Sequence, residues 1–229
     1  MTYNFLLLDL LLLIPALIIY ILRSDLRRVM LIMALFALPF AATEFLFYPE
    51  YWQPVFLFDL INYIGFGIED IIFVTVLAGL SSTIYAFCFR QKYVSLRSAA
   101  LKKSIKKGIY LLLISFTMLI ILLYFDAAPI YSALIIMSTV STVLLIYRYD
   151  LLVPALSGAT ITLVLYTGAC ILLKLLLPGI FQMSWNTDKF SNIFLFNIPL
   201  EELLYGFAAG LTGTVFYPAV FARKLVPRK

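Results

Sequence analysis

Long apolar runs, separated by short polar segments, recur along the whole chain. Each run is about 18 to 25 residues long, which is enough for a helix to cross the roughly 30 Å hydrocarbon core of a bilayer. The pattern predicts about seven helices, over residues 3–22, 29–48, 60–88, 108–125, 128–147, 151–177 and 194–222. The first run lacks a basic leader and a small-residue cleavage site, so we interpret it as a retained helix. The sequence therefore predicts an all-α, polytopic membrane protein.

The composition strengthens this prediction. Of the 229 residues, 64% are hydrophobic and 13% are charged, whereas roughly a quarter are charged in ordinary soluble domains. A soluble core of this size could not hide so much apolar surface. The net charge of +5 does not indicate nucleic-acid binding, because the basic residues are confined to the gaps between the apolar runs.

The distribution of basic residues predicts the orientation. All but two of the 17 Lys and Arg residues follow the first, third, fifth and seventh runs and so fall on one side. The exceptions are Lys189, on the other side, and Lys174, which lies near a helix end where it can snorkel. The positive-inside rule then predicts a cell-membrane protein with its N-terminus outside and its C-terminus in the cytoplasm.

An internal repeat is visible in the sequence. Four landmarks occur in the same order in both halves, and the pairs are 23–26 with 148–151, Trp52 with Trp185, 68–70 with 200–202, and 78–83 with 209–214. We therefore expect a first repeat over 1–107, a linker helix over 108–127 and a second repeat over 128–229. Both repeats begin on the same side, which predicts two parallel three-helix units related by a pseudo-two-fold axis along the membrane normal.

Six acids fall within the apolar helices, and they are Asp9, Glu44, Glu69, Asp70, Glu201 and Glu202. An acid at the centre of a spanning helix costs about 2.5–3.5 kcal/mol on insertion scales, so such residues usually face the bundle interior and serve a function. Burial without counter-ions favours the neutral form of a carboxylic acid, and a buried neutral acid can donate a proton. For Asp9 and Glu44 a hydrogen-bonding strut is the favoured interpretation, and Glu44 could also pair with Lys174.

The duplicated acidic pairs are the main catalytic candidates. The symmetry predicts Glu69 and Glu201 at matching depth, about ten residues or roughly 15 Å from the outer surface. We expect these two to face one cavity near the middle of the bilayer. Asp70 and Glu202 diverge from them by about 100° around the helix, and we expect them to take or relay a proton.

Aromatic residues surround these acids, and the substrate-binding candidates among them are Tyr63, Phe66, Phe73, Phe196 and Tyr205, to which we add Asp9 and Glu44. Any single ring is more readily explained by packing. Together, rings beside a proton donor suit an apolar substrate that becomes cationic, because aromatic faces attract cations.

The sequence lacks the residues and motifs that metal, thiol and dinucleotide chemistry require. The chain has no histidine, and its two cysteines, Cys88 and Cys170, show neither metal-ligand nor redox spacing. No Gly-x-Gly-x-x-Gly dinucleotide site is present. We therefore expect no metal, flavin or nicotinamide cofactor.

The segment 197–204, with Pro199-Leu200-Glu201-Glu202, resembles the Pro-x-Glu-Glu signature of the small membrane-bound lycopene cyclases of archaea, some bacteria and fungi. That family consists of two homologous three-helix units, either separate or fused, and this chain looks like the fused form. In the first half Gly67 stands where the family's proline is expected. The resemblance implies a lycopene β-cyclase, which converts the linear ends of lycopene to β-ionone rings by acid catalysis without redox change.

Other classes of membrane protein fit the sequence less well. An opsin-like receptor needs a mid-membrane lysine in the seventh helix, and a prenyltransferase needs paired Asp-rich motifs; neither is found. A proton-coupled transporter with buried carboxylates remains the alternative. The expected partners are lycopene or a related linear carotenoid and membrane lipid, with a homo-oligomer or contacts to other carotenoid enzymes left open.

Overall fold

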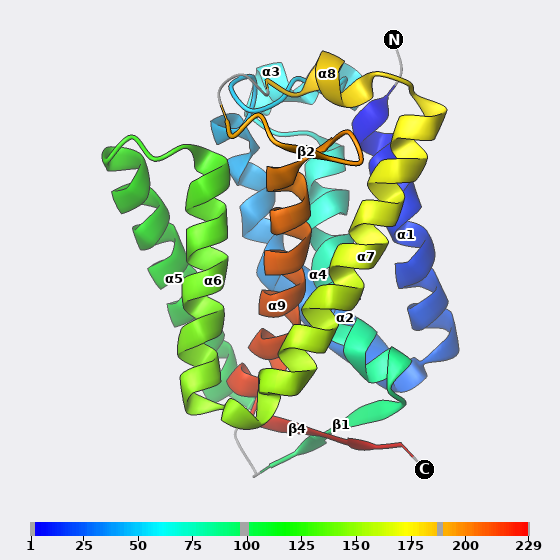
Figure 1. The fold of residues 1–229 in the computed structure, drawn as a ribbon. Helices are drawn as coiled ribbons and strands as arrows, with labels where there is room; N and C mark the ends of the chain where they lie inside the picture. Colours follow the sequence, from blue (N-terminus) through cyan, green and yellow to red (C-terminus); the bar gives the residue numbers. More distant parts are fainter. Residues whose placement is uncertain (1–2, 97–100, 187–189, 229) are drawn as a thin grey trace.

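The computed structural model describes residues 3–96, 101–186 and 190–228. Seven helical segments in these ranges are long and apolar enough to cross a membrane. They are α1 (Asn4–Leu22), α2 (Ser24–Ala37) continued by the 3₁₀ helix η1 (Leu38–Leu46), α4 (Ile68–Cys88), α5 (Leu101–Tyr124), α6 (Pro129–Tyr147), η3 (Tyr149–Leu151) continued by α7 (Leu152–Leu176), and α9 (Leu200–Val220). The prediction of an all-α protein with seven spanning helices is confirmed, and the two ends of the chain lie at opposite ends of the bundle (Figure 1).

Short elements close the two ends of this bundle. At the end near the N-terminus lie η2 (Leu57–Asp59), α3 (Leu60–Ile64), α8 (Ile180–Ser184) and a hairpin of β2 (Phe194–Leu195) with β3 (Ile198–Pro199). We call this the outer end. At the opposite end β1 (Gln91–Ser95) pairs antiparallel with β4 (Arg223–Pro227), as Figure 1 shows below the helices. The sequence pattern did not predict either strand pair.

Two expected helices are shorter than their apolar runs. The run 60–88 is interrupted at Gly65, which has a φ of 82°, and α4 begins only after Gly67. The run 194–222 starts with the β2–β3 hairpin, and α9 begins after Pro199, which has no N–H to donate. The four paired acids therefore lie in the first turns of α4 and α9, where the helix dipole favours negative charge. Glu69 and Glu201 are each the second residue of their helix, and their depth of about ten residues from the outer surface remains a prediction.

Helices α4 and α9 form the centre of the bundle, and small residues allow close packing there. A Cβ added to Gly158 of α7 would overlap Thr214 of α9, and one added to Gly210 of α9 would overlap Thr162 of α7. Across the centre, a Cβ added to Gly213 of α9 would overlap the hydroxyl of Ser81 in α4. These contacts bring the first turns of the two central helices, and so their acids, into one region.

Two arginines make matching sets of bonds in the two halves. Arg23 donates to both carboxylate oxygens of Asp25, at 2.9 and 2.8 Å, and to the carbonyls of Ala86 and Gln91. Arg148 repeats this set, at 2.8 and 2.7 Å to the carboxylate of Asp150, with the carbonyls of Pro218 and Arg223. Each arginine ties the end of one helix pair to the central helix of its own half, which supports the proposed repeat.

Three further contacts join residues that the repeat makes equivalent. Trp52 and Trp185 form an antiparallel bridge at the outer end, Ser81 packs on Gly213 in the middle, and Tyr93 pairs with Leu225 at the other end. The last two pairs are separated along the chain by the same number of residues as Glu69 and Glu201. We propose that the pseudo-two-fold axis passes through these three points. The resulting register is one residue away from the predicted match of 78–83 with 209–214.

The basic residues gather at the β1–β4 end of the bundle. Arg23 reaches the backbone of β1, Arg148 reaches the backbone of β4, and Arg228 lies 3.8 Å from the Asp25 carboxylate. Lys174 instead donates to the carbonyl of Phe196 at the outer end. Arg97, Lys189 and Lys229, which also entered the prediction, lie outside the described residues. That the β1–β4 end is cytoplasmic remains a prediction.

Candidate active site

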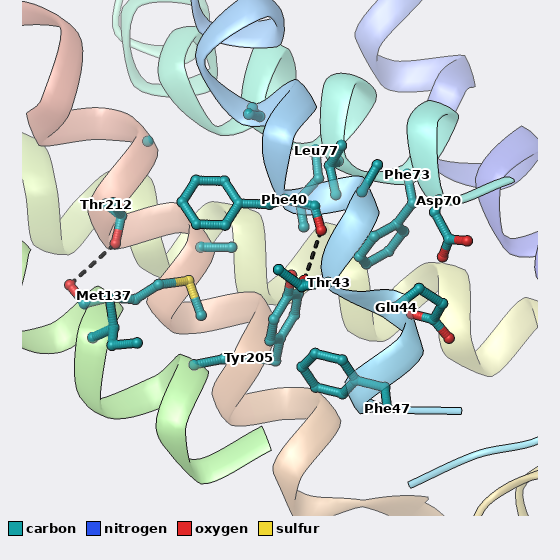
Figure 2. Close-up of a pocket in the computed structure, with 18 of the residues that line it drawn as sticks. Phe40, Thr43, Glu44, Phe47, Asp70, Phe73, Leu77, Met137, Tyr205 and Thr212 are labelled. Atoms are coloured by element: carbon teal, nitrogen blue, oxygen red, sulfur yellow. Dashed lines mark hydrogen bonds between the residues drawn. The ribbon is translucent and has the colours of Figure 1, made fainter. Parts of the chain in front are cut away.

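A cavity of about 260 Å³ lies between the α2–η1 segment and α6, with α4 and α9 behind it and α5 along its side. Its wall is mainly apolar and aromatic. Six residues that illustrate this, several of them drawn in Figure 2, are Phe40, Phe47, Phe73, Leu77, Met137 and Tyr205. Such a wall suits a hydrocarbon ligand.

Two carboxyl groups of the first half meet on this wall. Glu44 of η1 and Asp70 of α4 both line the cavity and lie on the same side of it in Figure 2. Their carboxyl groups are close enough to interact electrostatically. The indole N–H of Trp52 donates to Glu44 at 2.6 Å, and the N–H of Gly67 donates to Asp70 at 2.6 Å. Two neighbouring carboxyl groups in an apolar wall repel each other when both are ionised, and this repulsion favours a proton on one of them.

The acid of the second half that lines the cavity is Glu202 of α9. It accepts from the Tyr51 hydroxyl at 2.7 Å and the Trp185 indole at 2.9 Å through one oxygen, and from the Tyr166 hydroxyl at 2.6 Å through the other. Burial and the neighbouring Glu202 raise the pKa of Tyr51 well above its usual value, so this phenol stays a neutral donor. These three neutral donors therefore satisfy both oxygens of Glu202.

The structure does not bring Glu69 and Glu201 to the cavity, so the expectation that they face it is wrong. Glu69 is buried and accepts from the backbone N–H of Leu57 at 2.6 Å. Glu201 accepts from the backbone N–H of Ser191 at 3.0 Å and from the Tyr131 hydroxyl at 2.8 Å. Each therefore anchors the connecting segment of its own half. Neighbouring side chains on a helix diverge by about 100°. Asp70 and Glu202 can therefore face the cavity while Glu69 and Glu201 point away from it.

Asp9 and Glu44, the two isolated acids, differ from each other in the structure. Asp9 is fully buried in α1 but does not line the cavity, and neither of its oxygens has a hydrogen-bond partner among the described residues. Glu44 does line the cavity. It does not pair with Lys174, which bonds to a backbone carbonyl instead.

Two of the five aromatic candidates line the cavity. The rings of Phe73 and Tyr205 stack with their centroids 6.0 Å apart at an interplanar angle of 23°. Tyr63, Phe66 and Phe196 do not line it, and Tyr63 and Phe196 are exposed. The breaks before α4 and α9 place these three residues in the connecting segments at the outer end.

Sequence reasoning missed the donors that hold the acids. Tyr51 and Tyr166 carried no signal, because a tyrosine in an apolar run looks like packing. Trp52 and Trp185 are landmarks of the proposed repeat, and in the structure each donates a hydrogen bond to an acid that lines the cavity.

Residues 128–220 match the family model described as lycopene cyclase. This part of the chain is a lycopene cyclase domain. No curated protein and no solved structure matches the chain.

The cyclase domain comprises α6, α7 and α9, and so contributes Glu202, its donors Tyr166 and Trp185, and the Tyr205 ring. It identifies an enzyme of carotenoid biosynthesis that acts on a carotenoid, and the seven apolar helices make it an integral membrane protein. Glu44 and Asp70 lie outside the matched residues and complete the same cavity. Within the described ranges, no group of three or more Cys, Asp or Glu side chains could hold a metal ion.

Proposed function

We propose that the chain is a lycopene β-cyclase, which closes the linear ends of lycopene into β-ionone rings by acid–base catalysis. One observation carries the proposal. One apolar cavity is lined by two neighbouring carboxyl groups, Glu44 and Asp70, whose mutual repulsion favours a proton on one of them, and by Glu202, whose side chain accepts from three neutral donors. A proton donor and a base beside one hydrocarbon site are what a redox-neutral cyclisation needs.

The reaction then follows from these groups. The Glu44–Asp70 pair donates its proton to the terminal double bond of the substrate, which leaves a tertiary carbocation. The neighbouring alkene attacks this cation, so that one carbon–carbon bond forms and the positive charge moves into the new ring. Glu202 takes a proton from the ring carbon, and the ring double bond forms. One proton enters and one leaves, so no oxidant or reductant is consumed.

The wall of the cavity protects the cationic intermediates. The stacked rings of Phe73 and Tyr205 present aromatic faces, which attract cations. The segments at the outer end, held by Glu69 and Glu201, cover the first turns of α4 and α9. Exclusion of water prevents capture of the cation as an alcohol. Glu69 and Glu201 therefore act as positioning residues in this proposal.

Deuterium labelling tests the chemistry directly. Purified protein in liposomes that contain lycopene, transferred to D₂O, should give cyclised products with one deuterium for each ring formed. Proton transfer from an exchanged carboxyl group produces this label, because the added proton stays on the ring while a substrate proton is lost. Cyclised product without deuterium would overturn the acid mechanism, and absence of any cyclised product would overturn the function.

The alternative of a proton-coupled transporter is not favoured. It shares the buried acids, but it does not account for the cyclase domain over residues 128–220. The proposed orientation, with the outer end outside the cell and the β1–β4 end in the cytoplasm, rests on the arginines and lysines at that end.

A further inference from the structure

The proposed repeat creates two equivalent interfaces between the halves. Helices α1 and α6 are equivalent, as are α2 and α7, because Arg23 and Arg148 with their matching bonds follow the first helix of each half. The interface of α2 with α6 therefore corresponds to that of α7 with α1. In a symmetric protein both would be open or both closed.

The α1–α7 interface is closed. The two helices pack directly against each other and lie side by side in Figure 1. Buried residues of both helices, among them Leu12 of α1 and Cys170 and Leu173 of α7, belong to one continuous core. The α2–α6 interface instead contains the cavity.

Side-chain size explains part of this difference. Ala133 of α6 and Ala37 of α2 line the cavity from its two walls. Counted from the matching arginines, the equivalent of Ala133 is Leu8 of α1, which is larger and buried and also lines the cavity, and the equivalent of Ala37 is Thr162 of α7, which packs against Gly210 of α9. The smaller side chain of Ala133 therefore leaves space on the α6 side of the open interface.

Helix α5, which has no equivalent in the repeat, covers the side of the open interface. Its residues Leu112, Ser115 and Leu119 line the cavity. Its Phe116 stacks on Phe40 of η1, with centroids 5.0 Å apart and an interplanar angle of 12°. The linker helix therefore replaces wall that the α2–α6 contact does not supply.

The acids are distributed with the same asymmetry. The proposed donor pair needs Glu44 from η1, and the corresponding helix α7 contains no Asp or Glu. Helix α7 therefore supplies no acid to the closed interface, and the buried Asp9 of α1 does not line the cavity.

We propose that the chain has a single substrate cleft, the α2–α6 cavity, and that it cyclises one carotenoid end in each binding event. This inference rests on the proposed cyclase function and concerns how the site is used. A substrate whose first end has reacted must leave the cleft and enter again, with its other end first, before a second ring can form. A monocyclic carotenoid is then a released product that mixes with the membrane pool.

A label chase tests this use of the site. Protein in liposomes first converts isotopically labelled lycopene until monocyclic product is present, and a large excess of unlabelled lycopene is then added by vesicle fusion. We expect the chase to reduce labelled bicyclic product at least several-fold, because labelled monocyclic molecules must compete for the one cleft. Undiminished formation of labelled bicyclic product would overturn the inference, as would a chain that makes no second ring when monocyclic carotenoid is its only substrate. If no ring forms at all, the proposed function itself fails.

Two variants test the position of the cleft. Ala133→Phe fills the α2–α6 cavity, and we expect it to abolish the first and the second ring together. Ser138→Phe adds the same ring at an exposed position of α6 that does not line the cavity, and it should cyclise normally. Accumulation and thermal unfolding of both variants show whether they fold. A folded Ala133→Phe protein that still forms one ring at the normal rate would place a second site elsewhere and overturn the inference.

Discussion

The substitution Glu202→Gln separates the chemical role of a cavity acid from its structural role. Gln keeps the size of the side chain and one carbonyl oxygen, but it cannot accept a proton from the ring cation. Loss of a general base typically lowers the rate by about 10²–10⁴, which corresponds to about 3–5 kcal/mol in the activation barrier. We expect cyclisation to fall by this factor.

The hydrogen bonds indicate how much stability the same change costs. One oxygen of Glu202 accepts from both Tyr51 and Trp185, and the amide oxygen of Gln can keep these two bonds. The other oxygen accepts from Tyr166 and becomes an amide NH₂, so that this charge-assisted bond is lost. Such a bond contributes about 1.5–3 kcal/mol. The variant should therefore still fold, with a lowered unfolding temperature.

The matched control is Glu201→Gln, one residue earlier in the same helix. A single oxygen of Glu201 accepts from both Ser191 and Tyr131, so an amide oxygen preserves both bonds, and activity should stay within a few-fold of wild type. The assay is pigment analysis of proteoliposomes that contain lycopene, normalised to folded protein. Equal loss in both variants, or near-normal rates in Glu202→Gln, would refute the assignment of Glu202 as the base.

Further predictions concern the donor pair, the arginines and the orientation. Glu44→Gln and Asp70→Asn should each lower cyclisation by about 10²–10⁴, and the double variant no further, because the two groups share one proton; additive losses in rate would contradict a shared donor. Arg23→Ala should cost about 3 kcal/mol of stability by leaving two backbone carbonyls and a carboxylate without their donor. Arg148→Ala should cost less, since that side chain is 17% exposed against 6% for Arg23; thermal unfolding in detergent measures both, and the reverse order would count against this reasoning. A single cysteine at Lys92 in a cysteine-free background should resist labelling by an impermeant reagent in intact cells, and ready labelling would reverse the orientation.

Much of the fold could be predicted because the bilayer imposes simple rules. Apolar runs of sufficient length predicted all seven spanning helices. The sequence could not locate the breaks before α4 and α9, since apolar residues continue through them. At Gly65 the break depends on a positive φ, and at Pro199 on a hairpin that pairs residues only a few positions apart. Neither feature changes the hydrophobic pattern.

The candidate site was predicted only in part, for a geometric reason. Composition and motif identified the duplicated acids and the Phe73 and Tyr205 rings, because buried acids are rare in apolar helices. Which acid of each pair faces the cavity depends on the rotation of α4 and α9 about their axes, and the structure selects Asp70 and Glu202.

The sequence by itself determined the membrane class and the acids available for proton transfer, since both are written in residue type and spacing, and the same kind of signal supports the proposed similarity between the two halves. Only the tertiary structure decided that Glu44 joins Asp70, that Glu202 gathers donors from three distant segments, and that α1 and α7 close while α2 and α6 stay apart. Those outcomes depend on which side chains come into contact when separate helices pack. The pattern along a single helix does not specify its contacts with other helices.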